Sequence, residues 1–151
     1  MAITYATLST AFADIKGKSV AEVGRMIGGK VKINIDAGIF TNACAIRFSY
    51  AINKAEISIT AKDGKVSSGA DGKKYLYRIG DVEKFVKNKM LYTKVLSGDN
   101  SSDFEGEHGV IVFKDCGWND ASGHIDLYDG TKVEGHDYSL VCGKVILYVL
   151  P

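Results

Sequence analysis

Three cysteines and three histidines are the side chains of this sequence best suited to nucleophilic and acid–base chemistry, namely Cys44, Cys116, Cys142, His108, His124 and His136. Cys44 follows Asn42 closely, at the predicted start of a helix. Free backbone N–H groups and the helix dipole at such a start stabilise a thiolate, and they stabilise the oxyanion that forms when a thiolate attacks an amide. Cys44 is therefore the candidate nucleophile, and a small buried residue at a crowded helix start is the alternative interpretation.

His124 is the candidate general base. It opens the predicted strand at 124–130, where a rigid sheet would hold its imidazole in place. An ordinary histidine at a strand end is the alternative interpretation. His108 lies in the acidic, polar segment 97–109, where we expect it to be solvated.

A predicted hairpin after this strand identifies a partner for the imidazole. Asp129-Gly130 is a strong signal for a two-residue turn. With such a turn, Tyr128 lies opposite Thr131. Residues that alternate along a strand share a face, and diagonal neighbours on that face lie within side-chain reach. This register places Asp137 diagonally beside His124, so we predict that Asp137 orients the imidazole.

Two other residues stay open as the orienting group. Asp126 shares the face of His124 on its own strand, and a turn of three or four residues would shift the register and favour His136. A cysteine at a helix start, followed by a histidine and an acid on adjacent strands, is the arrangement of a thiol hydrolase. The residues alone therefore predict catalysis by Cys44, His124 and Asp137.

The elements that must position these residues follow from the apolar pattern. Helical spacing or capping signals, such as the capping box of Ser19 and Glu22, predict helices at 8–15, 19–28, 41–55 and from Asp81 onward. Alternating or β-rich segments predict extended structure at 30–36, 56–60, 74–79, 109–116, 124–130 and 138–150. The polar segments 62–73 and 97–109 are expected to be loops.

The order of these elements indicates the fold class. Helices come first and an antiparallel sheet follows, which predicts an α+β fold with N-terminal helices packed on a C-terminal sheet. The sequence contains no internal repeat, linker or low-complexity segment. We therefore expect residues 1–151 to form a single domain.

Composition and charge exclude several classes of protein. The 151 residues carry 19 Lys and Arg against 18 Asp and Glu, and this near-neutral balance argues against a nucleic-acid binder. An apolar share of 46% argues against a disordered chain, and the run VILYVL at 145–150 is too short to span a membrane. No phosphate-loop or dinucleotide motif occurs, so we expect no nucleotide cofactor.

The N-terminus carries no signal for secretion. It has no basic residue before Lys16 and no long apolar stretch. We expect the protein to be made in the cytoplasm and not to leave by the general secretory route.

Three segments of the sequence resemble the fourth family of the type VI secretion amidase effectors. The segment TNACAIRFSYAIN at 41–53 resembles the catalytic-helix motif of that family. The segment KKYLYRIGDVEKFV at 73–86 resembles its central strand–helix segment, and DCGWNDASGHIDLYDG at 115–130 resembles its histidine segment. The resemblance covers roughly residues 30 to 140, which is most of the chain.

The resemblance implies a papain-like, NlpC-type cysteine peptidase fold and a peptidoglycan amidase. Family members are injected into rival bacteria by the type VI secretion apparatus. In the periplasm of the rival they cut wall peptides between γ-D-glutamate and diaminopimelate. Cognate immunity proteins protect the producer. We expect no metal and no cofactor in this protein. A secretion machine that carries folded cargo agrees with the missing export signal.

Carried over residue by residue, the resemblance places the nucleophile at Cys44 and the base at His124. The acidic third member of the family lies on the strand after the histidine. Ungapped counting reaches Gly135, so this sequence departs from the family there and Asp137 remains our choice. The family often has a disulfide near that strand. No cysteine pair lies close together there, which leaves Cys116 with Cys142 as the candidate bond or as two free thiols.

Two other functions stay open. A zinc amidase could use His124, Asp126 and His136, although no HExxH motif occurs and Cys44 would then have no role. A catalytically dead binding module of the same fold is the non-enzyme alternative, and it is disfavoured because the cysteine and the histidine are both present.

Overall fold

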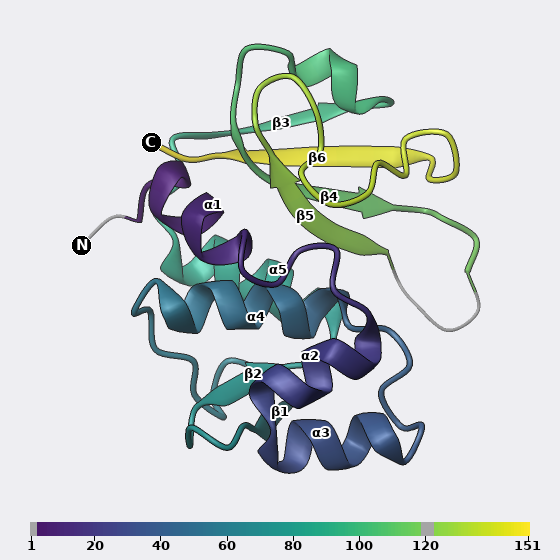
Figure 1. Cartoon of the computed structure of the whole chain (residues 1–151). Coiled ribbons are helices and arrows are strands. Elements are labelled where there is room, and N and C mark those ends of the chain that lie inside the picture. Colours follow the sequence, from purple (N-terminus) through teal and green to yellow (C-terminus); the bar gives the residue numbers. More distant parts are fainter. Residues whose placement is uncertain (1–2, 119–122) are drawn as a thin grey trace.

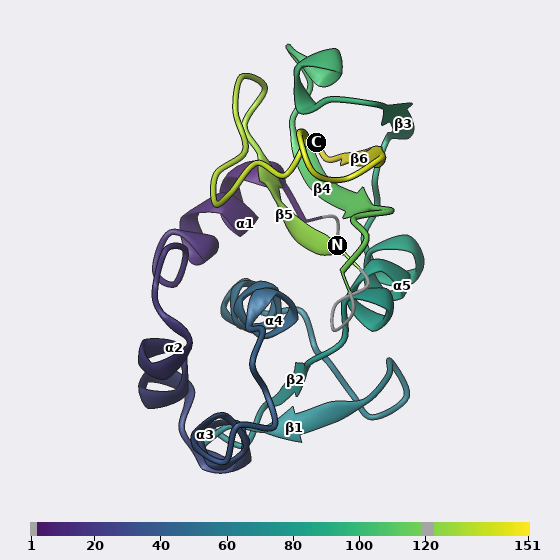
Figure 2. The same ribbon diagram turned by 90° about the vertical axis from the view of Figure 1, so that its right-hand side faces the viewer.

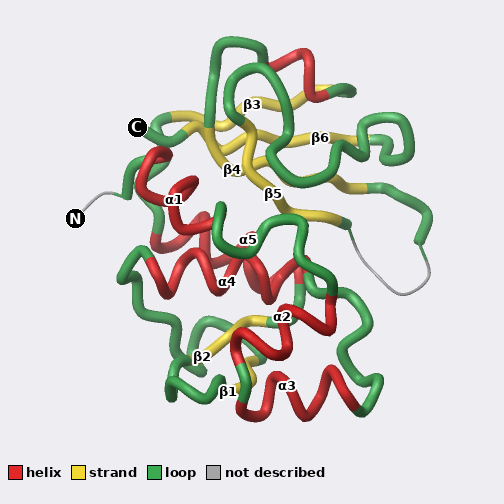
Figure 3. Tube along the Cα trace, in the orientation of Figure 1, coloured by secondary structure: helices red, strands yellow, loops and turns green. Residues whose placement is uncertain are grey.

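The four-stranded sheet and the helices occupy separate parts of the molecule. The structure is a computed structural model that describes residues 3–118 and 123–151. The main sheet lies on one side, and most of the helices lie on the other side together with a small two-stranded sheet (Figures 1 and 3). The predicted α+β arrangement, with N-terminal helices packed on a C-terminal antiparallel sheet, is confirmed.

Five α-helices are described, namely α1 (Tyr5–Phe12), α2 (Val20–Ile27), α3 (Gly29–Asp36), α4 (Cys44–Lys54) and α5 (Ile79–Lys89). The capping box that was predicted for Ser19 and Glu22 is present at the start of α2. The first helix begins earlier than expected because the hydroxyl of Thr4 accepts a hydrogen bond from the N–H of Thr7. Asp81 lies in the first turn of α5 rather than at its cap. Among the described residues, no helix is long and apolar enough to cross a membrane.

The segment 30–36 is a helix, so the extended structure predicted there is wrong. Gly28 and Gly29 both have positive φ, which lets α2 end and α3 begin within two residues. Val31 is buried, Ile35 packs against the core, and Ile33 is 65% exposed. Val31 and Ile35 lie four residues apart on one helix face, so the same apolar residues fit a helix as well as a strand.

Two strands form a small sheet, β1 (Val66–Ser68) and β2 (Lys74–Leu76). The predicted strand at 74–79 is present in part as β2, whereas Ile79 begins α5. However, β1 lies within the segment expected to be a loop, and 56–60 is not a strand. Glu56 adopts a left-handed conformation, and the N–H of Ile57 bonds back to the carbonyl of Ile52. The helix α4 thus closes with a turn, and no strand forms at 56–60.

The main sheet is antiparallel, with strand order β3 (Lys94–Gly98), β6 (Lys144–Val149), β4 (Gly109–Lys114) and β5 (His124–Tyr128). One face packs against the helices through side chains such as Val110, Val112, Ile125 and Leu127. The opposite face has its own buried cluster, which includes Ile111, Phe113, Tyr128 and Val145. Because both faces are covered, β4 and β6 are almost continuously apolar, whereas the edge strand β3 is partly exposed. The short 3-10 helix η1 (Ser101–Phe104) follows β3.

Helix α4 lies between the two sheets, as the turned view shows (Figure 2). Most of its residues are buried, and these include two polar ones, Ser49 and Asn53. The Ser49 hydroxyl donates to the carbonyl of Leu76 at 3.1 Å and accepts from the N–H of Leu76 at 3.0 Å. The Asn53 amide donates to the carbonyl of Lys74 at 2.9 Å. These bonds attach α4 to β2.

Cys116 and Cys142 form a disulfide, and Cys44 is free. The bond joins the segment after β4 to the segment before β6. It connects two loops at the same end of the main sheet.

Candidate active site

Cys44 is the first residue of α4 and is partly exposed. Its backbone N–H donates to the side-chain oxygen of Asn42 at 2.9 Å. The helix begins three residues later than the predicted range 41–55, and Ala43 is its N-cap. The thiol therefore lies at the positive end of the helix dipole, where a negative charge is stabilised.

His124 is brought against Cys44 from a strand that lies 80 residues further along the chain. The Sγ of Cys44 lies 2.9 Å from the Nδ1 of His124. The imidazole is 7% exposed and contacts the ring of Tyr138 edge-on, with ring centroids 4.7 Å apart. The ring of Phe113 lies 5.9 Å away on the neighbouring strand. The aromatic side chains exclude water from the imidazole and restrict its rotation.

Asp126 holds the other nitrogen of the imidazole. The Nε2 of His124 lies 2.7 Å from the Oδ2 of Asp126. Asp126 is 1% exposed, and its carboxylate accepts hydrogen bonds from the N–H groups of Leu127, Gly135 and His136 at 2.8, 2.9 and 3.0 Å. Three backbone donors compensate for burying the charge of the carboxylate. The structure thus brings Cys44, His124 and Asp126 into one chain of contacts.

The predicted register of the turn after β5 is wrong. Tyr128 bridges to Val133 rather than to Thr131, so the turn has four residues. The carboxylate of Asp129 accepts from the N–H groups of Thr131 and Lys132 at 2.8 and 2.7 Å, which stabilises the wider turn. The chain then passes over Asp126 instead of continuing as a paired strand.

Asp137 does not contact His124, because the strand pairing ends at Val133 and the chain then passes over Asp126, and its predicted placement is corrected. Its carboxylate accepts from the hydroxyl of Ser101 at 2.6 Å and from the N–H of Ser139 at 2.8 Å. Burial opposes ionisation of Asp137, but these hydrogen bonds outweigh burial and lower its pKa. His136, the other alternative, packs its ring against Tyr138 and contributes its backbone N–H to Asp126.

The pKa of His124 is raised. Burial alone would lower it, because burial disfavours the charged imidazolium. The contacts with Asp126 and Cys44 outweigh burial and raise the pKa to about 9. At neutral pH the imidazolium form is favoured, and that form can pair with a thiolate and donate a proton.

The sequence contained one usable signal for Asp126. His124 and Asp126 alternate along a single strand, so their side chains share a face whatever the turn does. The backbone donors of Gly135 and His136 and the ring of Tyr138 could not be found in this way, because their placement depends on a loop. Among residues 3–118 and 123–151, no group of three or more His, Cys, Asp or Glu side chains is arranged to hold a metal ion.

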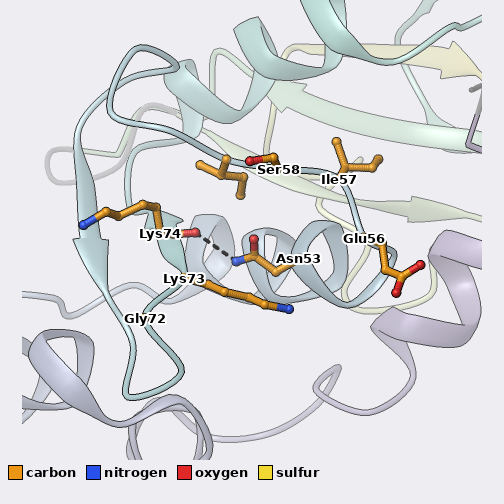
Figure 4. A pocket seen from close by; sticks show the side chains of 8 residues that line it. Asn53, Glu56, Ile57, Ser58, Gly72, Lys73 and Lys74 are labelled. Carbon is orange, nitrogen blue, oxygen red and sulfur yellow. Dashed lines mark hydrogen bonds between the residues drawn. The ribbon is translucent and has the colours of Figure 1, made fainter.

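A pocket of about 400 Å³ lies away from this site. It is lined by residues that include Asn53, Glu56 and Lys73, at the C-terminal end of α4 (Figure 4). Asn53 is nine residues beyond Cys44 in the same helix, which corresponds to about 14 Å along the helix axis. The pocket is therefore separate from the contact between Cys44 and His124.

A cysteine on the first turn of a central helix, facing a histidine on an antiparallel sheet, places this protein in the papain-like class of α+β folds. The family described as type VI secretion system (T6SS), amidase effector protein 4 (Tae4), matches residues 40–148. The chain belongs to this family, which confirms the resemblance seen in the sequence, and it is an amidase effector of type VI secretion.

Solved structures agree with this assignment. A chain in the structure of the Tae4/Tai4 effector–immunity system from Salmonella typhimurium is 36% identical to this chain, with a TM-score of 0.86. The match covers 98% of each chain. The effector Tae4 from Enterobacter cloacae is 30% identical with a TM-score of 0.89, covering 100% of this chain and 98% of that one. The Salmonella typhimurium effector in complex with the immunity protein Tai4 from Enterobacter cloacae is 34% identical with a TM-score of 0.87, covering 98% and 99%. A comparison with curated proteins found no match.

Proposed function

We propose that this protein is a cysteine peptidase that hydrolyses the γ-D-glutamyl–diaminopimelate bond of peptidoglycan stem peptides. The observation that supports it most directly is the contact of 2.9 Å between the Sγ of Cys44 and the Nδ1 of His124. Membership of an amidase family agrees with hydrolysis of an amide. We propose that residues 1–151 act as one catalytic domain, since one buried cluster contains side chains from all five described helices and from the main sheet.

In the proposed reaction, the Cys44 thiolate attacks the carbonyl carbon of the γ-D-glutamyl group. The helix start stabilises the oxyanion of the tetrahedral intermediate. His124, as the imidazolium, donates its proton to the amino group of diaminopimelate as the C–N bond breaks. Neutral His124 then takes a proton from water as the water oxygen attacks the thioester. The C–S bond breaks, which releases the Cys44 thiolate and the glutamyl carboxyl group, whose proton passes to the solvent. Asp126 keeps the imidazole in one orientation throughout.

The test is digestion of purified peptidoglycan peptides, with the products identified by mass spectrometry. Cys44→Ala should abolish cleavage and leave the circular dichroism spectrum unchanged, because a partly exposed cysteine at a helix start contributes little to the core. A chelator should have no effect on the wild type. Cleavage that survives Cys44→Ala but is lost on chelation would exclude the thiol mechanism and support the zinc alternative.

We propose that a cognate immunity protein and the type VI secretion apparatus are the protein partners of this effector. Related effectors from Salmonella typhimurium and Enterobacter cloacae were solved as complexes with Tai4 immunity proteins. An immunity protein would protect the producing cell from its own effector and from that of its sister cells.

We propose that the protein is made in the cytoplasm, is delivered by the type VI apparatus, and acts in the periplasm of the target cell. Peptidoglycan lies in that compartment, so expression in the cytoplasm should be tolerated. Fusion to a periplasmic export signal should lyse the host, and the same fusion carrying Cys44→Ala should not. Lysis by the unfused protein would indicate a different target.

A further inference from the structure

A buried carboxylate, Glu134, joins the N-terminal helix to the segment that follows β5. Its Oε2 accepts hydrogen bonds from the hydroxyls of Tyr5 and Ser9, the second at 2.8 Å. Its Oε1 lies 3.3 Å from the Nζ of Lys16, and its side chain is 6% exposed. Helix α1 and strand β5 lie side by side in both ribbon views (Figures 1 and 2). Three residues near the N-terminus thus hold one side chain from the C-terminal part of the chain.

Glu134 directly precedes the two peptide groups that bind Asp126. The N–H groups of Gly135 and His136 donate to the Asp126 carboxylate at 2.9 and 3.0 Å. The N–H of Glu134 itself bonds to the carbonyl of Leu127 at 2.8 Å. A Cβ at Gly135 would clash with the Asp126 carboxylate. The backbone at Gly135 therefore lies so close to this carboxylate that it leaves no space for a side chain. A small movement at Glu134 would therefore change the hydrogen bonds to Asp126.

We propose that Glu134 is a positioning residue, which anchors residues 134–136 to α1 so that their N–H groups hold Asp126 against His124. The proposal rests on the proposed function, because it assigns Glu134 to the Cys44–His124–Asp126 arrangement. Without its carboxylate, Tyr5 and Ser9 would lose their partner and the segment would lose its attachment to α1. Asp126 would then support the imidazole less firmly.

The charge state of His124 provides a readout that a purely structural role would not change. The titratable groups that face this imidazole are Cys44 from α4, Asp126 from its own strand and Tyr138 from the following loop. Asp126 is one of the two groups that raise the pKa of His124 to about 9. A less firmly held Asp126 lowers that pKa toward the ordinary value of about 6.5.

The chain contains a closely matched control. Glu83 is also a buried carboxylate that binds a tyrosine hydroxyl and a lysine, with Tyr148 at 2.6 Å and Lys114 at 2.9 Å. Its side chain is 9% exposed, against 6% for Glu134. None of its described hydrogen bonds reaches the segment that binds Asp126. Replacing either glutamate should destabilise the fold, but only Glu134 should affect His124.

The experiment is an NMR titration of the imidazole of His124 in the wild type, Glu134→Ala, Glu134→Gln and Glu83→Ala. In Glu134→Ala the pKa of His124 should be lower by about one pH unit, and kcat on stem peptides should fall about tenfold. Glu134→Gln retains an oxygen acceptor for Tyr5 and Ser9 and should behave almost like the wild type. Glu83→Ala should keep the His124 titration and kcat of the wild type. If Glu134→Ala and Glu83→Ala give the same His124 titration, Glu134 has a structural role alone and the proposal is wrong.

A second variant tests the same anchor from the other side. Tyr5→Phe combined with Ser9→Ala removes both hydroxyl donors and leaves Glu134 unchanged, so it should shift the titration in the same direction. If Glu134→Ala does not fold, the His124 titration of this double variant still tests the proposal. The titration needs no substrate, so it separates this inference from the proposed function. A shifted titration in an enzyme that does not cleave stem peptides would support the anchor and refute the substrate.

Discussion

At the scale of single residues, Asp126 rather than Asp137 is the carboxylate that contacts the imidazole of His124. Asp126 and His124 lie two residues apart on β5, so the strand itself places their side chains on one face. Asp137 uses its carboxylate to hold Ser101 and Ser139 instead. Asp137 thus links the segment after β5 to η1 by hydrogen bonds, and it does not contact the imidazole of His124.

Asp126→Asn should therefore lose much more activity than Asp137→Asn. A neutral amide cannot stabilise the imidazolium, and loss of the acid in a serine protease triad costs on the order of 10⁴-fold. We expect a loss of about 10²-fold here, because a thiolate at a helix start depends less on its base. Asp137→Asn should cost only a few-fold. Steady-state kinetics of the two variants on stem peptides compares them, and equal losses would show that Asp126 is not the orienting acid.

The same substitution should change the pH dependence of activity. The imidazolium of His124 is needed to protonate the leaving amine, so wild-type activity should fall as the pH rises through about 9. In Asp126→Asn this decline should begin at a lower pH, because a group that raises the pKa of His124 is lost. The folded-state pKa is above the ordinary value of about 6.5, so the His124 contribution to stability is complete below that pH. It is lost as the pH rises through about 9.

At the scale of secondary structure, α4 is positioned by polar side chains within an otherwise apolar interface. Ser49 and Asn53 are four residues apart, so they lie on one face of α4 and both reach the backbone of β2. Ser49 satisfies both the N–H and the carbonyl of Leu76, much as a neighbouring strand would. Cys44, the first residue of the same helix, is thus part of an element that is hydrogen-bonded to β2.

Ser49→Ala should destabilise the protein by about 2–4 kcal/mol, because it leaves a buried N–H and a buried carbonyl of Leu76 without a partner. Ser58→Ala is the matched control. Ser58 is exposed, so its replacement should change the free energy of unfolding by less than about 0.5 kcal/mol. Urea denaturation measures both variants. Equal urea midpoints for Ser49→Ala and Ser58→Ala would mean that water or a rearranged side chain replaces the hydrogen bonds of Ser49 to β2.

At the scale of the whole molecule, a covalent bond fixes the loops near His124. The disulfide of Cys116 and Cys142 closes a segment of 26 residues that contains β5 and Tyr138. The N–H of Cys142 also bonds to the carbonyl of Tyr138 at 3.0 Å. Cys142, the second cysteine of the disulfide, therefore helps to hold Tyr138 in place, and the ring of Tyr138 contacts His124.

Thiol titration of the denatured, unreduced protein should find one free thiol, that of Cys44. Reduction should lower the free energy of unfolding by about 3 kcal/mol, since opening a loop of this length returns conformational entropy to the unfolded chain. Cys116→Ser combined with Cys142→Ser should have the stability of the reduced wild type, as measured by urea denaturation. Three free thiols in the unreduced sample would contradict the bond.

The sequence by itself determined the features that depend on local signals. Asn42 beside Cys44 marks a helix start, His124 opens a β-rich segment, and the order of elements indicates an α+β fold. Each of these follows from interactions over a few residues, and each is present in the structure. The helix at 30–36 was missed because Val31 and Ile35 satisfy both a helical and an alternating pattern.

Only the tertiary structure decided which acid contacts the imidazole. Asp126, His136 and Asp137 were all compatible with the sequence, and the choice depended on where the strand pairing after one turn ends. The carboxylate of Asp129 stabilises a turn of four residues. Pairing then ends at the bridge of Tyr128 with Val133, and the chain passes over Asp126 instead of placing Asp137 on a strand beside His124. The attachment of Glu134 to α1 joins parts of the chain more than 100 residues apart. Contacts at that separation depend on the packing of the whole fold, which no local pattern encodes.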